Sequence, residues 1–255
     1  MKTYILSIAV ANYRSFEKLQ NPINDSQALI GILENRYQIA ESIFLHDEEV
    51  SPSAIEQAMR NLNDKIEEDD TLIIVFNGHG KSQEGSNAFY GLLSNSDENN
   101  TSTWYDTSRL FNLLLELENI KNMQYIAVIV NACEAGMLFT LPYITNNSAD
   151  GNSKARLLIT AGRGRSTVSD STITSPNNSP FVAEVVQFLK DNSEEKLSLS
   201  KALRVLTASK QTGLFFSFST TVSIDEILTD LVNWSSIACL IRIKAGEFSF
   251  SSKDS

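Results

Sequence analysis

Two apolar stretches decide the fold, TLIIVFNGHG at residues 71–80 and YIAVIVNACEAG at residues 125–136. Each begins with a run of β-branched and aliphatic residues that is too short for a helix and typical of a strand buried on both faces. Each run ends at an asparagine, which is followed by a small residue and, within five positions, by a glycine. The two stretches therefore predict two central strands, each followed by a polar turn.

Outward from these stretches, short apolar runs alternate with segments of helical period. Further strands are expected over residues 4–10, 43–45 and 157–160. Helices are expected after Asn24-Asp25-Ser26, which offers a cap, after Ser51-Pro52, over residues 106–118, and from Ser179-Pro180. Alternation of this kind is typical of an α/β domain in which helices cover a mainly parallel sheet.

Composition limits the classes of function. The 255 residues carry a net charge of −10 and are 42% hydrophobic, which fits one ordinary globular domain. An acidic chain gains nothing from displacing counterions, so we expect neither nucleic acid nor an anionic membrane as a partner. The apolar run at residues 4–11 fits a first strand better than a signal peptide. No stretch approaches the ~18 apolar residues of a membrane span.

Cysteine and histidine are scarce, with Cys133, Cys239, His46 and His79 as the complete set. A structural zinc site needs four clustered Cys or His ligands, and the sequence has no such cluster, so this kind of site is not expected. Two widely separated cysteines suit a reducing compartment, and we expect a cytoplasmic protein. Cys239 lies inside an apolar run and is interpreted as core, and His46, beside three acidic residues, as surface.

Less regular segments follow the second stretch. Residues 145–153 and 162–179 read as polar loops, the second too long for an ordinary connection. Residues 199–206 form a further helical stripe. Beyond Gly213, residues 214–218 and 238–243 resemble strands, and residues 224–231 resemble a helix. The terminal residues 249–255 are expected to fray.

His79 and Cys133 are the candidate catalytic residues. Parallel strands deliver their carboxyl ends to one edge of a sheet, where ligands bind, and the single helical crossover between the two strands favours adjacency. A histidine near a thiol can take its proton and later return it to a leaving amine. The Gly80 amide could donate to a developing oxyanion, and a helix dipole would stabilise Glu134. The competing interpretation is a buried cysteine and a structural histidine.

In this order the motifs resemble the caspase-like clan of cysteine peptidases, closest to bacterial metacaspase-like and CHAT-type caspases. The resemblance runs through Asn24-Asp25, Leu45-His46-Asp47, residues 70–80, residues 130–136 and residues 157–163, and covers roughly residues 1–190. The histidine precedes the cysteine by 54 positions (133 − 79), near the ~50 of caspases.

The resemblance implies a caspase-like three-layer α/β/α sandwich with a mainly parallel central sheet. It implies one peptidase domain over residues 1–255, with a core of 1–190 and residues 191–255 completing it. Cys133 would be the nucleophile, His79 the general base and acid, and the amides of Gly80 and Cys133 the oxyanion hole. Asp25 matches a metacaspase pocket residue, whereas Asn131 stands where a second aspartate is usual, which weakens a preference for Arg or Lys. Arg163 and Arg165 keep a preference for Asp open.

Partners and regulation follow from the resemblance as well. Substrates would be proteins, and stand-alone bacterial members serve defence or cell-death pathways after switching by an effector, another protease or oligomerisation. Lys154 and Arg156 are candidate maturation sites. No cofactor or metal is expected; some metacaspases use calcium, and Asp97-Glu98 is an acidic loop. Two alternatives stay open, a non-catalytic caspase-fold scaffold and a peptide ligase that uses the same dyad.

Overall fold

A computed structural model describes residues 2–83, 88–121, 123, 125–140, 155–161, 165, 167–173, 175–191 and 214–218. Within these ranges the central sheet has the strand order β2-β1-β3-β7-β8-β9. Its strands are β1 (Thr3–Ala9), β2 (Ile39–His46), β3 (Thr71–Asn77), β7 (Tyr125–Asn131), β8 (Ala155–Ala161) and β9 (Leu214–Phe218). Neighbouring strands are parallel except for the pair β8–β9, which is antiparallel. The expected mainly parallel sheet is confirmed.

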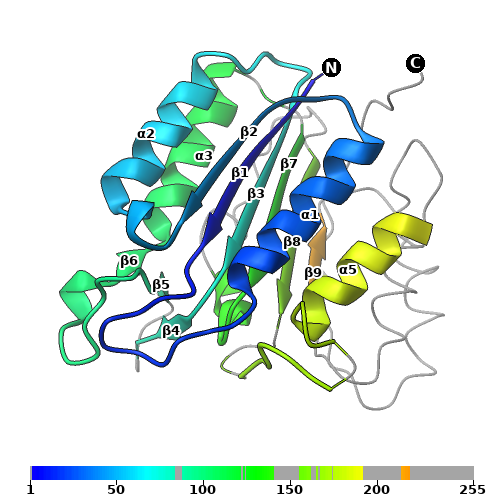
Figure 1. Cartoon of the computed structure of the whole chain (residues 1–255). Helices are drawn as coiled ribbons and strands as arrows, with labels where there is room; N and C mark the ends of the chain where they lie inside the picture. The colour runs from blue at the N-terminus through cyan, green and yellow to red at the C-terminus, as the bar shows by residue number, and fades with distance from the viewer. Residues whose placement is uncertain are drawn as a thin grey trace, which may run out of the picture.

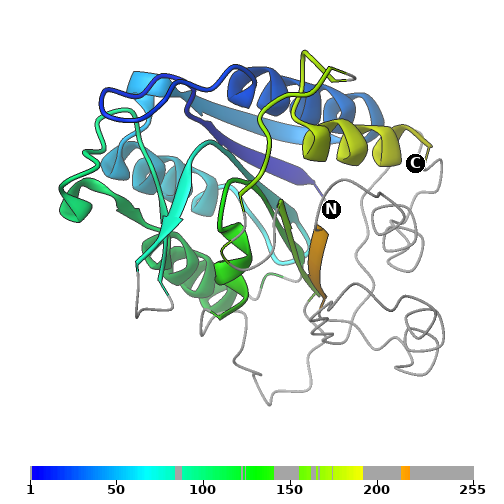
Figure 2. The same cartoon turned by 90° about the horizontal axis from the view of Figure 1, so that it is seen from below.

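Helices cover both faces of this sheet (Figure 1). They are α1 (Pro22–Arg36), α2 (Pro52–Asn63), α3 (Ser108–Lys121) and α5 (Pro180–Asp191), with 3₁₀ helices η1 (Asp47–Glu49), η2 (Thr101–Thr103) and η3 (Ala135–Thr140). Figure 2 shows α1 and α5 side by side on one face, with α2 and α3 on the other. The chain is therefore an α/β/α sandwich.

Strand alternation divides the core between the two faces. Leu6, Leu72 and Ile74 point toward α2 and α3, whereas Ile5, Ile73 and Val75 point toward α1 and α5. Both sets are buried, because successive side chains of a strand lie on opposite faces of the sheet. Because both faces of these strands are buried, their sequences are continuous apolar runs.

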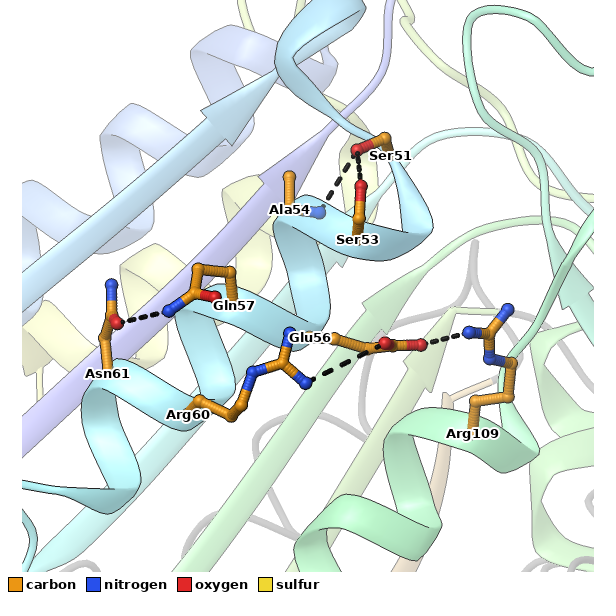
Figure 3. A network of polar contacts seen from close by, with 8 residues as sticks. All are labelled: Ser51, Ser53, Ala54, Glu56, Gln57, Arg60, Asn61 and Arg109. Carbon is orange, nitrogen blue, oxygen red and sulfur yellow. Dashed lines mark hydrogen bonds and ion pairs between the residues drawn. The ribbon is translucent and has the colours of Figure 1, made fainter.

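Helix α2 makes polar contacts at its N-terminal end and along its flank (Figure 3). The Ser51 hydroxyl caps the helix by accepting a hydrogen bond of 3.1 Å from the Ala54 amide, and the predicted start of the helix at Ser51-Pro52 is confirmed. Glu56 pairs with Arg109 of α3 and lies 4.0 Å from Arg60. These contacts align α2 with α3 beside the sheet.

Some predicted boundaries were wrong. Helix α1 begins at Pro22 with Asn21 as its cap, so Asn24 and Asp25 lie in its first turn. The reason is Pro22, whose fixed φ suits the first helical position. Strand β2 is longer than the predicted three residues, because it pairs with β1 along its length. The segments at 145–153, 199–206, 224–231 and 238–243 lie outside the described residues.

A small second sheet lies beyond the carboxyl end of β3. It consists of β4 (Gly80–Ser82), β5 (Phe89–Gly91) and β6 (Tyr105–Asp106) in antiparallel order. Figure 1 shows β4 directly below β3, at the edge where the large strands end. Throughout the described ranges, no helix is both long and apolar enough to cross a bilayer.

Candidate active site

The turns that carry His79 and Cys133 lie side by side. Strands β3 and β7 are neighbours in register, with Asn77 opposite Asn131. Just beyond them, the Gly78 amide donates a 3.1 Å hydrogen bond to the Asn131 carbonyl oxygen. His79 and Cys133 each follow two residues after that pair, so both stand at the carboxyl edge of the sheet.

The histidine is held from the loop that follows β1. Its Nε2 lies 2.8 Å from the Glu17 carbonyl oxygen, and its backbone amide donates a 2.8 Å hydrogen bond to the Tyr13 hydroxyl. The rings of Tyr13 and His79 are 4.7 Å apart between centroids. A carbonyl oxygen can only accept, so Nε2 carries the proton and Nδ1 of the neutral ring is left to accept one.

The glycines on either side of His79 are required by close contacts within the protein. A Cβ at Gly78 would lie 2.7 Å from the Tyr13 hydroxyl, and one at Gly80 would lie 2.6 Å from the Cys133 carbonyl oxygen. Gly80 therefore lets β4 pass directly against the backbone of the cysteine turn. The two turns touch main chain to main chain.

Cys133 is a free, half-buried cysteine with a backbone amide directed at its sulfur. The Val168 amide donates to Sγ at 3.4 Å, and the Val168 carbonyl oxygen lies 3.9 Å from Sγ. Asp170 ties this segment to the start of α1, because its carboxylate accepts from the amides of Gln20 at 2.5 Å and Asn21 at 3.2 Å. Part of the loop predicted over 162–179 thus lies next to the sulfur.

The thiol and the imidazole do not hydrogen-bond to each other among the described residues. Their partners are Val168 and Glu17, respectively. Such catalytic bonds are often long without substrate and tighten only in the complex. The arrangement brings a thiol and an imidazole to one edge of the sheet without a direct hydrogen bond between them.

Glu134 has a contact that the sequence did not indicate. Its Oε2 accepts hydrogen bonds from the Ser82 amide at 2.8 Å and the Ser82 hydroxyl at 2.5 Å. Its backbone has φ +59°, and the short helix η3 follows. The carboxylate thus bonds to β4, and its expected stabilisation by a helix dipole stays a prediction.

Asp25 and Asn131, the predicted pocket residues, meet at the same edge. Asn131 Nδ2 donates to Asp25 Oδ2 at 3.0 Å and to the Ser179 hydroxyl at 2.9 Å. The other carboxylate oxygen accepts from the Asn178 side chain and the Ser179 amide, both at 3.0 Å. Asp25 has no exposed surface. Burial raises its pKa to about 6, although the hydrogen bonds from Ser179 and Asn178 act to lower it.

The other candidate residues have different positions in the fold. The His46 side chain is 43% exposed and its Nε2 lies 3.6 Å from Glu49 Oε2, as expected of a surface residue. Arg165 is exposed and donates to the Gln83 carbonyl oxygen at 3.4 Å. Arg156 is not in a loop but within β8, opposite Ile126, because the strand begins at Ala155. Lys154, Arg163 and Cys239 lie outside the described residues.

The acidic loop holds no cluster of ligands. Asp97 accepts from the Asn99 amide at 2.8 Å, and Glu98 lies 3.6 Å from Lys81 Nζ. Within the described ranges, no three His, Cys, Asp or Glu side chains are grouped so that they could hold a metal ion.

Sequence reasoning missed several residues that build the site: Tyr13, the Glu17 carbonyl, Ser82, Val168 and the pair Asn178–Ser179. Tyr13 and Glu17 lie in a segment without helical or strand period, and the role of Glu17 involves its backbone alone. Ser179 was seen as a helix start, and a serine before proline was the available signal. The contact of Ser179 with Asp25 could not be seen in the same way, because the two residues are 154 positions apart.

Comparisons with known proteins agree with this architecture. Residues 5–142, more than half of the chain, match the family model of the metacaspase, peptidase C14 domain. Protein GSU0716 from Geobacter sulfurreducens has a similar structure, with a TM-score of 0.63, 13% identity and coverage of 88% of this chain and 96% of that one. Caspase-1 from Spodoptera frugiperda has a TM-score of 0.58 and 12% identity, over 80% and 75% of the two chains. No curated protein is a significant match by sequence. The fold is thus caspase-like.

Proposed function

Because the chain belongs to the metacaspase family of C14 peptidases, we propose that it is a cysteine endopeptidase in which Cys133 and His79 do the chemistry. The observation that carries this proposal is the contact between the two turns, where a Cβ at Gly80 would lie only 2.6 Å from the Cys133 carbonyl oxygen. The Glu17 carbonyl supports the role of His79 as a base, because it fixes the ring by Nε2 and leaves Nδ1 to accept a proton.

The proposed reaction has two halves. Nδ1 of His79 takes the thiol proton, and Sγ of Cys133 attacks the scissile carbonyl carbon. The amides of Gly80 and Cys133 donate to the oxygen as it becomes negative. The C–N bond then breaks, the amine leaves with the proton from the imidazolium, and a thioester remains. Water, losing a proton to His79, attacks the thioester, and the acid product leaves as the thiol regains its proton.

We propose that substrates carry Arg or Lys before the scissile bond. Asp25 supports this preference, since a carboxylate at the site edge favours a cation, and neutral Asn131 beside it limits the preference. The carboxylate is covered by Asn178 and Ser179, so a substrate cation reaches it only when that segment moves aside. Cleavage after neutral residues is the outcome expected if the segment stays in place.

The family acts on proteins, and we propose that this chain is an effector in a defence or cell-death response. That setting rests on the resemblance to stand-alone bacterial members, which are switched on by another protein, by a protease or by oligomerisation. Its test is expression in cells of the wild type and of Cys133→Ala. Toxicity that depends on Cys133 would support the proposal, and toxicity of both would contradict it.

The decisive experiment is incubation with a peptide library, followed by mass spectrometry of the cut sites. Cys133→Ala and His79→Ala should abolish cleavage, whereas His46→Ala, a change at the exposed histidine, should leave it unchanged. Cleavage that survives Cys133→Ala would refute the peptidase. Ligated instead of hydrolysed products would identify acyl transfer to amines by the same dyad. A wild-type chain that neither cuts nor joins peptides would favour a scaffold.

A further inference from the structure

A side-chain contact joins the strand that follows His79 to the turn that follows Cys133. Glu134 Oε2 accepts from both the amide and the hydroxyl of Ser82, at 2.8 and 2.5 Å. Ser82 is the last residue of β4, and Glu134 precedes η3. Both side chains are only partly exposed. One oxygen of one carboxylate thus receives two donors from a strand 52 positions earlier in the chain.

The backbone at Glu134 indicates that this contact determines the local conformation. Its φ of +59° lies in the left-handed region, which glycine adopts readily and glutamate rarely. Residues held in such conformations persist only where their surroundings fix them, and they cluster at functional sites. Asp47 is the other non-glycine residue with positive φ among the described residues, and its carboxylate is likewise filled by donors from another loop.

The contact joins the two segments that carry the proposed oxyanion donors. Gly80 lies two residues before Ser82 on β4, and Cys133 lies directly before Glu134. The two segments are in close contact, because a Cβ at Gly80 would lie only 2.6 Å from the Cys133 carbonyl oxygen. Steric contact stops the segments from moving closer, and the Ser82–Glu134 bonds stop them from moving apart. The spacing of the two amides is therefore fixed from both sides.

We propose that Glu134 is a positioning residue, which sets the oxyanion hole by bonding β4 to the nucleophile turn. This inference rests on the proposed peptidase function. Glu134 does not touch the reacting atoms; it acts through the amides of Gly80 and Cys133. The interaction it controls is made only when the carbonyl oxygen becomes negative, so its loss should lower kcat and leave KM unchanged.

Three variants separate the hydrogen bonds from charge and from backbone strain. Glu134→Gly removes the contact but suits the left-handed backbone, and kcat should fall about 100-fold, as for other small displacements of catalytic groups. Glu134→Gln keeps one acceptor oxygen, and both bonds end on one oxygen, so kcat should stay within about threefold of wild type. Ser82→Ala keeps the hydrogen bond from the backbone amide, and its kcat should lie between those of the two Glu134 variants.

Glu98→Gln is the matched control, because it alters the exposed carboxylate that pairs with Lys81 of β4. It should change kcat less than about twofold.

Two probes distinguish a displaced oxyanion hole from a damaged fold. A peptide aldehyde forms a tetrahedral adduct that uses the hole, and its inhibition constant should rise in Glu134→Gly in proportion to the fall in kcat. Alkylation of Cys133 by iodoacetamide forms no oxyanion, and its rate should not change. The aldehyde carries the best residue found in the peptide library.

Several outcomes would overturn the inference. A Glu134→Gly variant with wild-type kcat would show that the contact is dispensable. A fall in alkylation that matches the fall in kcat would indicate general damage to the site, and a Gln variant as slow as the Gly variant would assign the effect to charge. A wild-type chain that cleaves no peptide would instead refute the proposed function, and the catalytic role of Glu134 with it.

Discussion

The hydroxyl of Tyr13 accepts a 2.8 Å hydrogen bond from the backbone amide of His79 and donates one of 2.9 Å to the Val10 carbonyl oxygen. The hydroxyl thus bridges the end of β1 to the turn that follows β3. Burial raises the pKa of Tyr13 above its ordinary value of 10.0, so the hydroxyl keeps its proton at neutral pH. It also fills the space beside Gly78, which explains why no side chain fits there.

Tyr13→Phe should therefore weaken both the fold and the site. The substitution leaves the His79 amide and the Val10 carbonyl without their partner, which costs about 1–3 kcal/mol in the free energy of unfolding. Urea denaturation measures this loss, and peptide cleavage should slow because the His79 turn is less well fixed. Tyr90→Phe is the control: its hydroxyl makes one exposed 3.4 Å contact with Gln83, so stability should change by less than about 0.5 kcal/mol. Equal effects of the two substitutions would contradict the bridging role.

Gly80→Ala should abolish cleavage. The new Cβ would lie 2.6 Å from the Cys133 carbonyl oxygen and 2.5 Å from the Phe89 ring, so one of the two turns must move. We expect kcat to fall by about 100-fold or more, since small displacements of catalytic groups have effects of that size. The cleavage rate of the library peptides is the measurement.

Gly31→Ala is the matched control for this glycine. Gly31 lies within α1, and a Cβ there meets nothing within 4 Å. Alanine in a helix interior is more stable than glycine by about 0.5–1 kcal/mol, so this variant should unfold at a higher urea concentration and cleave normally. Normal cleavage by Gly80→Ala would show that the close approach of the two turns is not needed for activity.

The sequence was informative where one interaction dominates. The runs in β3 and β7 are apolar because helices cover both of their faces, and this also placed His79 and Cys133 at one edge. Ser51-Pro52 predicted the start of α2 because a cap and its proline are neighbours in sequence. The side chains that fix the site could not be predicted in this way. Ser82 and Glu134 are 52 positions apart, and nothing local in either segment indicates the other.

The predicted pocket residues show the same limit. The resemblance assigned Asp25 and Asn131 to one pocket, and in the structure the two side chains are hydrogen-bonded to each other. Motifs carry no information on what covers a carboxylate, and Asn178 and Ser179 come from a long loop without period. Burial of Asp25 therefore emerged only from the tertiary structure.

Asp47 should contribute stability that is lost in acid. Its carboxylate accepts hydrogen bonds from the Ala11 amide at 2.8 Å, the Asn12 amide at 2.9 Å and the Asn12 side chain at 2.7 Å. Burial raises the pKa of Asp47, but the hydrogen bonds from Asn12 and Ala11 outweigh burial and hold the pKa below 3.8. The folded state thus binds the proton more weakly than the unfolded chain.

Asp47→Asn tests this contribution, because asparagine keeps an acceptor oxygen and tolerates the left-handed backbone at this position, where φ is +46°. The wild type should be the more stable protein at neutral pH. Its advantage should shrink as the pH falls through about 4 and below. Urea midpoints across this range measure the difference. Asp69→Asn, a change at an exposed turn residue, should show no such trend, and a difference for Asp47→Asn that is constant with pH would contradict the argument.

Asp25 should have the opposite pH dependence. Its pKa is raised from 3.8 to about 6 because burial disfavours the charged carboxylate. The folded state therefore binds the proton more tightly than the unfolded chain. The stability that this proton provides is complete below about pH 4 and is lost as the pH rises through about 6. At about 1.4 kcal/mol per pH unit, the loss is on the order of 3 kcal/mol.

Asp25→Asn tests this loss, because asparagine stays neutral throughout and Asn131 can present its amide oxygen to the new NH₂ group. The free energy of unfolding of the wild type should fall relative to that of Asp25→Asn between pH 4 and 7, by about 3 kcal/mol. Parallel pH profiles of the two proteins would show that Asp25 is ionised at no cost in the folded state, and hence that water or a cation reaches it past Asn178.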